Sequence, residues 1–172
     1  MYKLLFIALV FALFAACSGK KTETPPTADS VSAAAADVPA PAGLAFSPLN
    51  GYAVRNTVGM SDSVNFFLLT SQEQLDKMFI ADRSMNSEMS TPDFVINYTV
   101  AVVCLPRLEK TTIILEKVEV GGSAINVYVT ITRGEKQKFA SKPAQIFAIE
   151  RRDGYGALQF FVNGKQSKAI PL

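Results

Sequence analysis

Short runs of alternating apolar and polar residues dominate the second half of the chain. Ile125, Val127 and Val129 are separated by single polar or amphipathic residues, which is the period of a β-strand with one buried and one wet face. A β-branched run over residues 111–120 precedes this strand and ends at two glycines. Because such a glycine pair is typical of a tight connection, the two runs are predicted to form a hairpin.

Further apolar or β-branched runs predict the remaining strands. They cover residues 52–58, 64–69, 94–105, 146–150 and 158–162, and residues 169–170 are expected to pair briefly at the end. The apolar second half of the 94–105 run predicts a central strand that is buried on both faces. Turn residues predict two hairpins, one between runs 52–58 and 64–69 and one between runs 146–150 and 158–162. The polar segments 107–110 and 134–142 are predicted to be loops.

One segment has the period of a helix. Ser71 is a candidate N-cap, with Gln74 three residues later as its capping-box partner. Leu75 and Phe79 then lie one turn apart on an apolar face, which predicts a helix that fades by residue 84. Together the elements predict a mainly β (α+β) fold: an antiparallel sheet or small sandwich with one short covering helix.

The N-terminus carries an export signal. Lys3 precedes an uninterrupted apolar run over residues 4–14, which is shorter than the roughly twenty residues that a membrane-spanning helix needs and fits the apolar core of a signal peptide. Ala15 and Ala16 stand before Cys17. This arrangement resembles the lipobox of bacterial lipoproteins, which implies cleavage after residue 16 and lipidation of Cys17. The alternative is an ordinary secretory signal whose cleavage site contains a cysteine.

The predicted organisation therefore has three parts. Residues 1–16 are the signal peptide, residues 17–42 are the lipidated Cys17 and a flexible tether, and residues 43–172 form a single globular β-rich domain. The tether is rich in Lys, Thr, Ser, Pro and Ala, a composition that buries too little apolar surface to offset its conformational entropy. Acyl chains contribute about 0.8 kcal/mol per buried methylene, so two or three of them anchor a protein stably.

The residues after Cys17 predict where the anchored protein lies. Ser18 follows the cysteine, and no aspartate stands there, which resembles sorting to the outer membrane. The following Gly-Lys-Lys lacks the acidic cluster associated with surface export. The expected location is the outer membrane, lipid-anchored and facing the periplasm.

Charge and composition narrow the classes of function. The chain has 17 basic and 15 acidic residues, a formal net charge of +2, and this balance argues against nucleic acid or an anionic membrane surface as partner. There is no histidine, and Cys104, the second of two cysteines, lies in an apolar run that predicts burial. No metal, cofactor or catalytic residue is therefore predicted, because the usual zinc and Cys/His arrangements lack their ligands.

Two features suggest a binding surface. The basic segment that includes Lys142 concentrates positive charge, and Arg151 and Arg152 are expected to continue it in space beside a Tyr in a Gly-rich turn. Tyrosine is a common anchor of recognition surfaces, although a solvated loop is the simpler explanation of the charges and such a turn is also ordinary. The candidate residues are Arg133, Lys136, Lys138, Arg151, Arg152 and Tyr155.

From residue 64 onward the order of parts resembles the C-terminal domain of the protease complex subunit PrcB family. The shared features are an early strand, a capped helix, a Pro-Asp-Phe segment that begins at Pro92, an apolar strand and then β-branched and Pro-led strands. The family's Thr-Gly-Gly-Tyr turn has no counterpart in residues 107–112, and no functional residue is carried across. The resemblance implies a small β-rich accessory or binding domain.

The sequence thus predicts a membrane-tethered, non-enzymatic binding or accessory domain of the cell envelope, with an envelope protein as a possible partner. One alternative is a protease-modulating, inhibitor-like module. Another is an enzyme whose groups converge only in the fold, for example Asp93, Tyr98 and Glu109 in one pocket. A third is a structural component that works through oligomerisation.

Overall fold

The computed structural model describes residues 43–82 and 88–172. The predicted signal peptide, Cys17 and the tether lie outside the described residues, and so do residues 83–87, which include the predicted end of the helix. Within the described ranges, no helix has both the length and the apolar character to cross a membrane.

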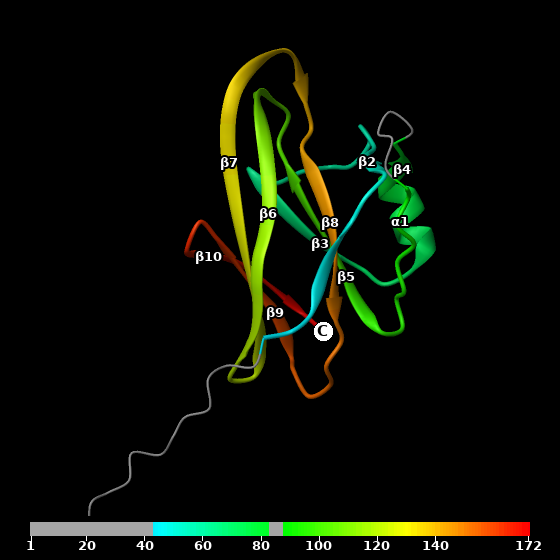
Figure 1. Cartoon of the computed structure of the whole chain (residues 1–172), viewed down its shortest axis with the longest axis vertical. Helices are drawn as coiled ribbons and strands as arrows, with labels where there is room; N and C mark the ends of the chain where they lie inside the picture. The colour runs from blue at the N-terminus through cyan, green and yellow to red at the C-terminus, as the bar shows by residue number, and fades with distance from the viewer. Residues whose placement is uncertain (1–42, 83–87) are drawn as a thin grey trace, which may run out of the picture. The chain divides into compact units, whose positions relative to one another are not determined.

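The described part of the chain is a β-sandwich with an added layer, so the predicted mainly β fold with antiparallel sheets and one short helix is confirmed (Figure 1). The first sheet has the order β1 (Phe46–Leu49), β8 (Ala144–Glu150), β5 (Asn97–Cys104), β3 (Val64–Leu69). The second has the order β10 (Lys165–Pro171), β9 (Ala157–Val162), β7 (Ala124–Ser141), β6 (Arg107–Gly121). Neighbouring strands are antiparallel except β7 and β9, which are parallel.

The central strand β5 is buried on both of its faces, as its sequence predicts. It pairs with β3 on one side and β8 on the other, and every residue after Asn97 is buried. Val100 and Val102 point into the sandwich core, whereas Ala101 and Val103 point into a second core on the opposite face. The first sheet therefore needs a cover on each side.

The sandwich core lies between the two sheets. Phe66 of β3 stacks on Phe160 of β9, with ring centroids 4.4 Å apart, and Ile125 and Val127 of β7 are fully buried beside them. Burying side chains of this size contributes about 1.5–3 kcal/mol each. The apolar residues of the alternating pattern in β7 are thus the ones that point into this core.

The outer face of the first sheet is covered by the helix α1 (Gln72–Met78) and by two short paired strands, β2 (Tyr52–Val54) and β4 (Phe79–Ala81). Leu75 of α1 and Phe79 at the start of β4 are the large side chains of this second core. Ser71 caps α1 as predicted: its hydroxyl accepts a hydrogen bond from the Gln74 amide at 3.3 Å. The side chain of Gln74 reaches back to the Thr70 amide at 3.0 Å.

Two local predictions around the helix are wrong. The helix ends at Met78, and residues 79–81 continue as a strand because they pair with β2. The hairpin predicted between residues 52–58 and 64–69 does not form, since β2 pairs with β4 and β3 pairs with β5. In both cases a partner distant in the sequence overrides a local signal.

Three further predictions fail for the same reason. Residues 107–110 and most of 134–142 are strand instead of loop, because the β6 and β7 strands continue to pair there, with Glu109 opposite Lys136 and Arg107 opposite Ser141. β8 and β9 form no hairpin, since they belong to different sheets. Where both faces of a paired strand are exposed, its residues are polar without alternation, so the sequence pattern does not distinguish it from a loop.

Two tight turns have the positive φ angles that glycine and asparagine favour, and the first of them was predicted from its glycine pair. Gly122, with φ of 61°, lies in the turn that connects β6 to β7. Asn163 and Gly164 both have positive φ, 49° and 78°, in the tight turn between β9 and β10, which is the backbone conformation that Asn-Gly favours.

The second core should be as important for stability as its burial indicates. We expect Leu75→Ala to lower the free energy of unfolding by about 2–5 kcal/mol, because a fully buried leucine leaves a cavity. Leu108→Ala is the matched control, since Leu108 is 48% exposed and its truncation should cost less than about 1 kcal/mol. Urea denaturation measures both, and equal losses would contradict the layer assignment.

Candidate functional site

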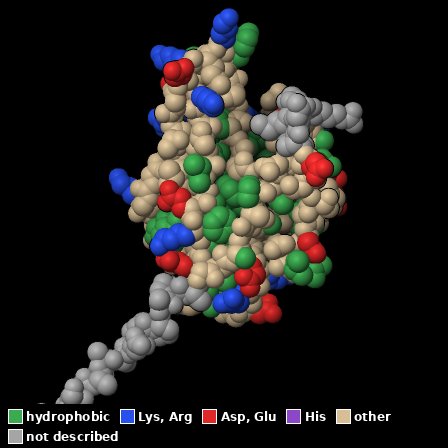
Figure 2. Space-filling model, in the orientation of Figure 1, with side chains coloured by type: hydrophobic (Ala, Val, Ile, Leu, Met, Phe, Trp, Pro, Cys, Tyr) green, Lys and Arg blue, Asp and Glu red, His purple; other side chains and the backbone are tan. Residues whose placement is uncertain are grey.

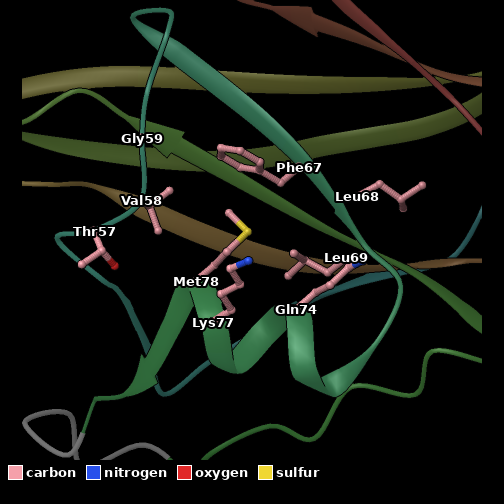
Figure 3. A pocket seen from close by; sticks show the side chains of 9 residues that line it. All are labelled: Thr57, Val58, Gly59, Phe67, Leu68, Leu69, Gln74, Lys77 and Met78. Carbon is pink, nitrogen blue, oxygen red and sulfur yellow. The ribbon is translucent and has the colours of Figure 1, made fainter.

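An apolar groove of about 470 Å³ opens between α1 and the outer edge of β3 (Figure 3). We call it the α1–β3 groove. Its lining residues come from three separate segments of the chain: Thr57, Val58, Gly59, Phe67, Leu68, Leu69, Gln74, Lys77 and Met78. Figure 3 shows the side chains of Val58, Phe67 and Met78 directed toward the space between the helix and the strand. Lys77 is the one charged residue in this lining.

The segment 57–59, which forms the wall of the groove opposite β3, is held in place by hydrogen bonds to backbone carbonyls near it. The Arg55 amide donates to the Met78 carbonyl at 2.8 Å, and its guanidinium Nε donates to the Asp76 carbonyl at 2.9 Å. The ammonium group of Lys142 lies 3.3 Å from the carbonyl oxygens of Arg55, Asn56 and Val58. These bonds tie the segment that carries Val58 to both the helix and the start of β8.

A second groove, of about 310 Å³, lies near the C-terminal end of β3 on the other face of the first sheet. We call it the Tyr155 groove. It is lined by Leu68, Thr70, Tyr98, Arg151, Asp153, Gly154, Tyr155 and Leu172. The Arg151 guanidinium lies 5.0 Å from the centroid of the Tyr98 ring, and the Tyr98 hydroxyl donates to the Arg152 carbonyl at 3.2 Å. The turn between β8 and β9 is thereby fixed to the sheet.

A third groove, of about 480 Å³, lies at the other end of β3. We call it the Lys168 groove. It is lined by Asp62, Ser63, Val64, Val162, Ser167 and Lys168. Leu68 lines both the α1–β3 groove and the Tyr155 groove. Strand β3 is thus bordered by hollows on both faces of its sheet.

The structure divides the predicted binding surface in two. Arg133, Lys136 and Lys138 lie on the last part of β7, before the chain turns into β8. Arg151, Arg152 and Tyr155 follow the far end of β8, seven residues on. A strand of that length spans about 23 Å, so the expectation that Arg151 and Arg152 continue the basic segment is wrong. Only the second group borders a groove.

The basic group on β7 is solvent-exposed. Figure 2 shows Lys and Arg side chains gathered over the end of β6 and β7 that lies away from their hairpin turn. Phe139 in this part of β7 is 82% exposed. Lys142, in contrast, is half-buried and bonded to the carbonyls beside the α1–β3 groove. The charges that looked like one loop therefore have two different structural roles.

The polar residues named for an enzyme alternative do not meet. Asp93 precedes β5, and its carboxylate accepts hydrogen bonds from the amides of Val95 and Ile96. Glu109 lies beyond the opposite end of β5, opposite Lys136. Tyr98 is buried in the sandwich core. The expectation of a shared pocket for Asp93, Tyr98 and Glu109 is wrong.

A small polar cluster lies on the outer face of the second sheet. The hydrogen bond from Tyr128 is the largest cause that holds the pKa of Glu119 below its ordinary value, and the bond from Lys117 is the next. The bond between Tyr128 and Glu119 also raises the pKa of Tyr128. The Lys117 ammonium lies 3.0 Å from the Glu119 carboxylate and 4.3 Å from the Tyr128 ring centroid. Tyr128 also stacks on Phe161. These contacts join β6, β7 and β9 across their solvent side.

Cys104 is buried and unpaired, which agrees with its prediction as a core residue. Burial raises the pKa of its thiol, and the neighbouring Arg107 and Arg133 oppose that effect only in part. Among residues 43–82 and 88–172, no cluster of three His, Cys, Asp or Glu side chains is arranged to hold a metal ion.

The α1–β3 groove was missed by sequence reasoning. Its residues are locally ordinary, and only long-range pairing brings them together. One signal was present: residues 66–69 are four consecutive apolar residues, so both faces of this strand are apolar. Such a strand is expected in the middle of a sheet, whereas β3 lies at an edge.

Comparison of the chain with protein-family models, curated proteins and solved structures gives no significant match. The resemblance to the PrcB family in the order of parts thus stays a prediction.

The burial of Cys104 has a direct chemical test in the Cys17→Ala chain, where it is the one remaining cysteine. We expect its thiol to react slowly with an aromatic disulfide reagent in the native state and rapidly in urea, because a buried thiol with a raised pKa forms little accessible thiolate. The absorbance of the released thiolate gives both rates. Equal rates in the two conditions would show that Cys104 is exposed.

Proposed function

We propose that this protein is a membrane-tethered, non-enzymatic binding domain of the cell envelope, and that its binding site is the α1–β3 groove. The observation that carries the proposal is the groove itself. Ligand sites are typically concave, largely apolar and supplied with a few polar groups that fix orientation. The α1–β3 groove has a volume of about 470 Å³, apolar walls from Val58, Phe67 and Met78, and Lys77 and Gln74 at its border.

The way the groove is built also supports a binding role. Its lining comes from three segments of the chain, and the hydrogen bonds of Arg55 and Lys142 hold the segment that carries Val58 against the helix and the start of β8. A site that is shaped before its ligand arrives loses less conformational entropy on binding.

The sequence supports the tethered location. The apolar run, the small residues before Cys17 and the polar segment up to residue 42 together form the pattern of an exported lipoprotein with a spacer. From its length and composition, we expect this spacer to separate the domain from the membrane. A binding domain on such a spacer samples partners at and near the membrane surface.

Binding at the groove is tested with anilinonaphthalene sulfonate, an apolar aromatic anion that complements both the lining and Lys77. We expect its fluorescence to rise on the full chain and NMR amide shifts to map to Val58, Phe67 and Met78. Val58→Asp should weaken the binding at least about tenfold, because it places an unpaired carboxylate in the apolar wall.

The matched control is Val95→Asp, the same substitution at a side chain that is 77% exposed and outside the groove. It should leave the affinity for the dye unchanged. Binding that is insensitive to Val58→Asp, or that is lost equally in both variants, would contradict the groove as the site.

The tether is tested separately through Cys17. We expect wild-type chain expressed in a Gram-negative host to fractionate with membranes and to incorporate labelled palmitate. Cys17→Ala should appear in the soluble fraction without label, because the acyl chains supply the membrane affinity. Membrane association of Cys17→Ala at the wild-type level would contradict lipid anchoring.

A further inference from the structure

Strand β3 has one paired edge and one open edge. The Leu105 amide donates to the Ser63 carbonyl, and Val64 is opposite Cys104. In an antiparallel ladder the hydrogen-bonding residues alternate, so Asn65, Phe67 and Leu69 turn their amide and carbonyl groups toward β5. The residues between them, Val64, Phe66 and Leu68, turn theirs to the outside.

Both ends of this open edge are closed by side chains. At the far end, the Thr70 amide donates to the Gln74 side chain at 3.0 Å. At the near end, the side-chain oxygen of Asn65 accepts hydrogen bonds from the Ser61 and Asp62 amides, and its side-chain nitrogen donates to the Asp62 carbonyl. In the part of the chain that the structure describes, no hydrogen bond connects the outward groups of Val64, Phe66 and Leu68 to another element.

The other edges of the two sheets carry features that discourage pairing, and β3 does not. Proteins protect edge strands with proline, lysine and bulges. Strand β1 contains Pro48, and β10 contains Lys165, Lys168, Pro171 and a register shift. Strand β6 has three register shifts and is covered in part by Gly43 and Leu44. The residues of β3, Val-Asn-Phe-Phe-Leu-Leu, include no proline and no charge, and its register is continuous.

The three grooves are placed as the side chains of an added strand would require. Successive side chains of a strand point to opposite faces, and cross-strand neighbours share a face. A residue opposite Phe67 would point to the α1 side, into the α1–β3 groove. Residues opposite Leu68 and Val64 would point to the sandwich side, toward the Tyr155 groove and the Lys168 groove.

We propose that the ligand of this site is an extended polypeptide segment of another protein, which adds to β3 as a fifth strand of the first sheet. Main-chain hydrogen bonds to Val64, Phe66 and Leu68 provide sequence-independent affinity, and the grooves select alternate side chains. This inference rests on the proposed function, and it specifies the class of partner and the way that the partner binds.

Charge narrows the partner further. The α1–β3 groove has Lys77 and no carboxylate in its lining, whereas Arg151 and Lys168 in the other two grooves are accompanied by Asp153 and Asp62. A segment that carries acidic residues beside its apolar ones therefore complements the site.

Charge argues against a second copy of this chain as the occupant. Pairing of β3 with β3 of another copy would bring a second Lys77 to the face that already carries the first, and like charges disfavour that approach.

The test uses the full chain in detergent and a synthetic octapeptide of alternating valine and threonine flanked by glutamates. Two modified peptides carry N-methyl groups, one on the valine nitrogens and the other on the threonine nitrogens. A strand that pairs along one edge turns only one of these sets toward β3. We expect one methylated peptide to lose at least about tenfold in affinity and the other to bind like the parent. Val58→Asp should weaken parent binding and Val95→Asp should not.

The remaining outcomes overturn the inference, and they separate it from the proposed function. If both methylated peptides bind like the parent, only side chains are recognised and no strand is added. If no peptide binds while anilinonaphthalene sulfonate still shifts the groove amides, the groove is a binding site for other ligands. If neither binds, the proposed function fails as well. A full chain that is a dimer through β3 and excludes the peptides would make a second copy the occupant.

Discussion

The burial of β5 on both of its faces is the constraint on which the rest of this structure depends. Its residues after Asn97 are all buried, so each face of the first sheet must be covered by another layer. The second sheet covers one face, and α1 with β2 and β4 covers the other. This added layer is small, and it leaves a hollow where it meets the outermost strand.

The candidate site follows from that geometry. Strand β3 is apolar on both faces because it lies between two cores, yet it has a neighbour on one edge only. The α1–β3 groove forms where the helix lies over this edge, and Arg55 and Lys142 hold the facing segment in place. The apolar character that stabilises the fold is therefore also what makes the edge receptive to a further strand.

Local sequence patterns predicted which segments are strands or helix better than they predicted which strands pair with each other. The alternation in β7, the all-apolar β5 and the Ser71 cap were each visible because burial or capping imposes a residue type at a fixed spacing. The short β1 and β4, the extension of β6 and β7, and the division of the strands between sheets were not predicted. These features depend on pairing between distant segments, which leaves no regular local spacing.

The candidate site shows the same division. Tyr155 and Arg151 were singled out from their local turn, and the structure does place them at a groove beside β3. Val58, Phe67 and Met78 attracted no notice, because each belongs to a different segment and none carries a reactive group. The run of apolar residues in β3 indicates a strand covered on both faces, but its open edge is evident only from the strand order.

The measurement that tests the account most directly is hydrogen exchange of the six β3 amides in the free full chain. The account predicts alternation: the amides of Asn65, Phe67 and Leu69 exchange slowly because they bond to β5, whereas those of Val64, Phe66 and Leu68 exchange quickly. Equally slow exchange at all six positions would contradict it, because the outer edge of β3 would then already have a partner.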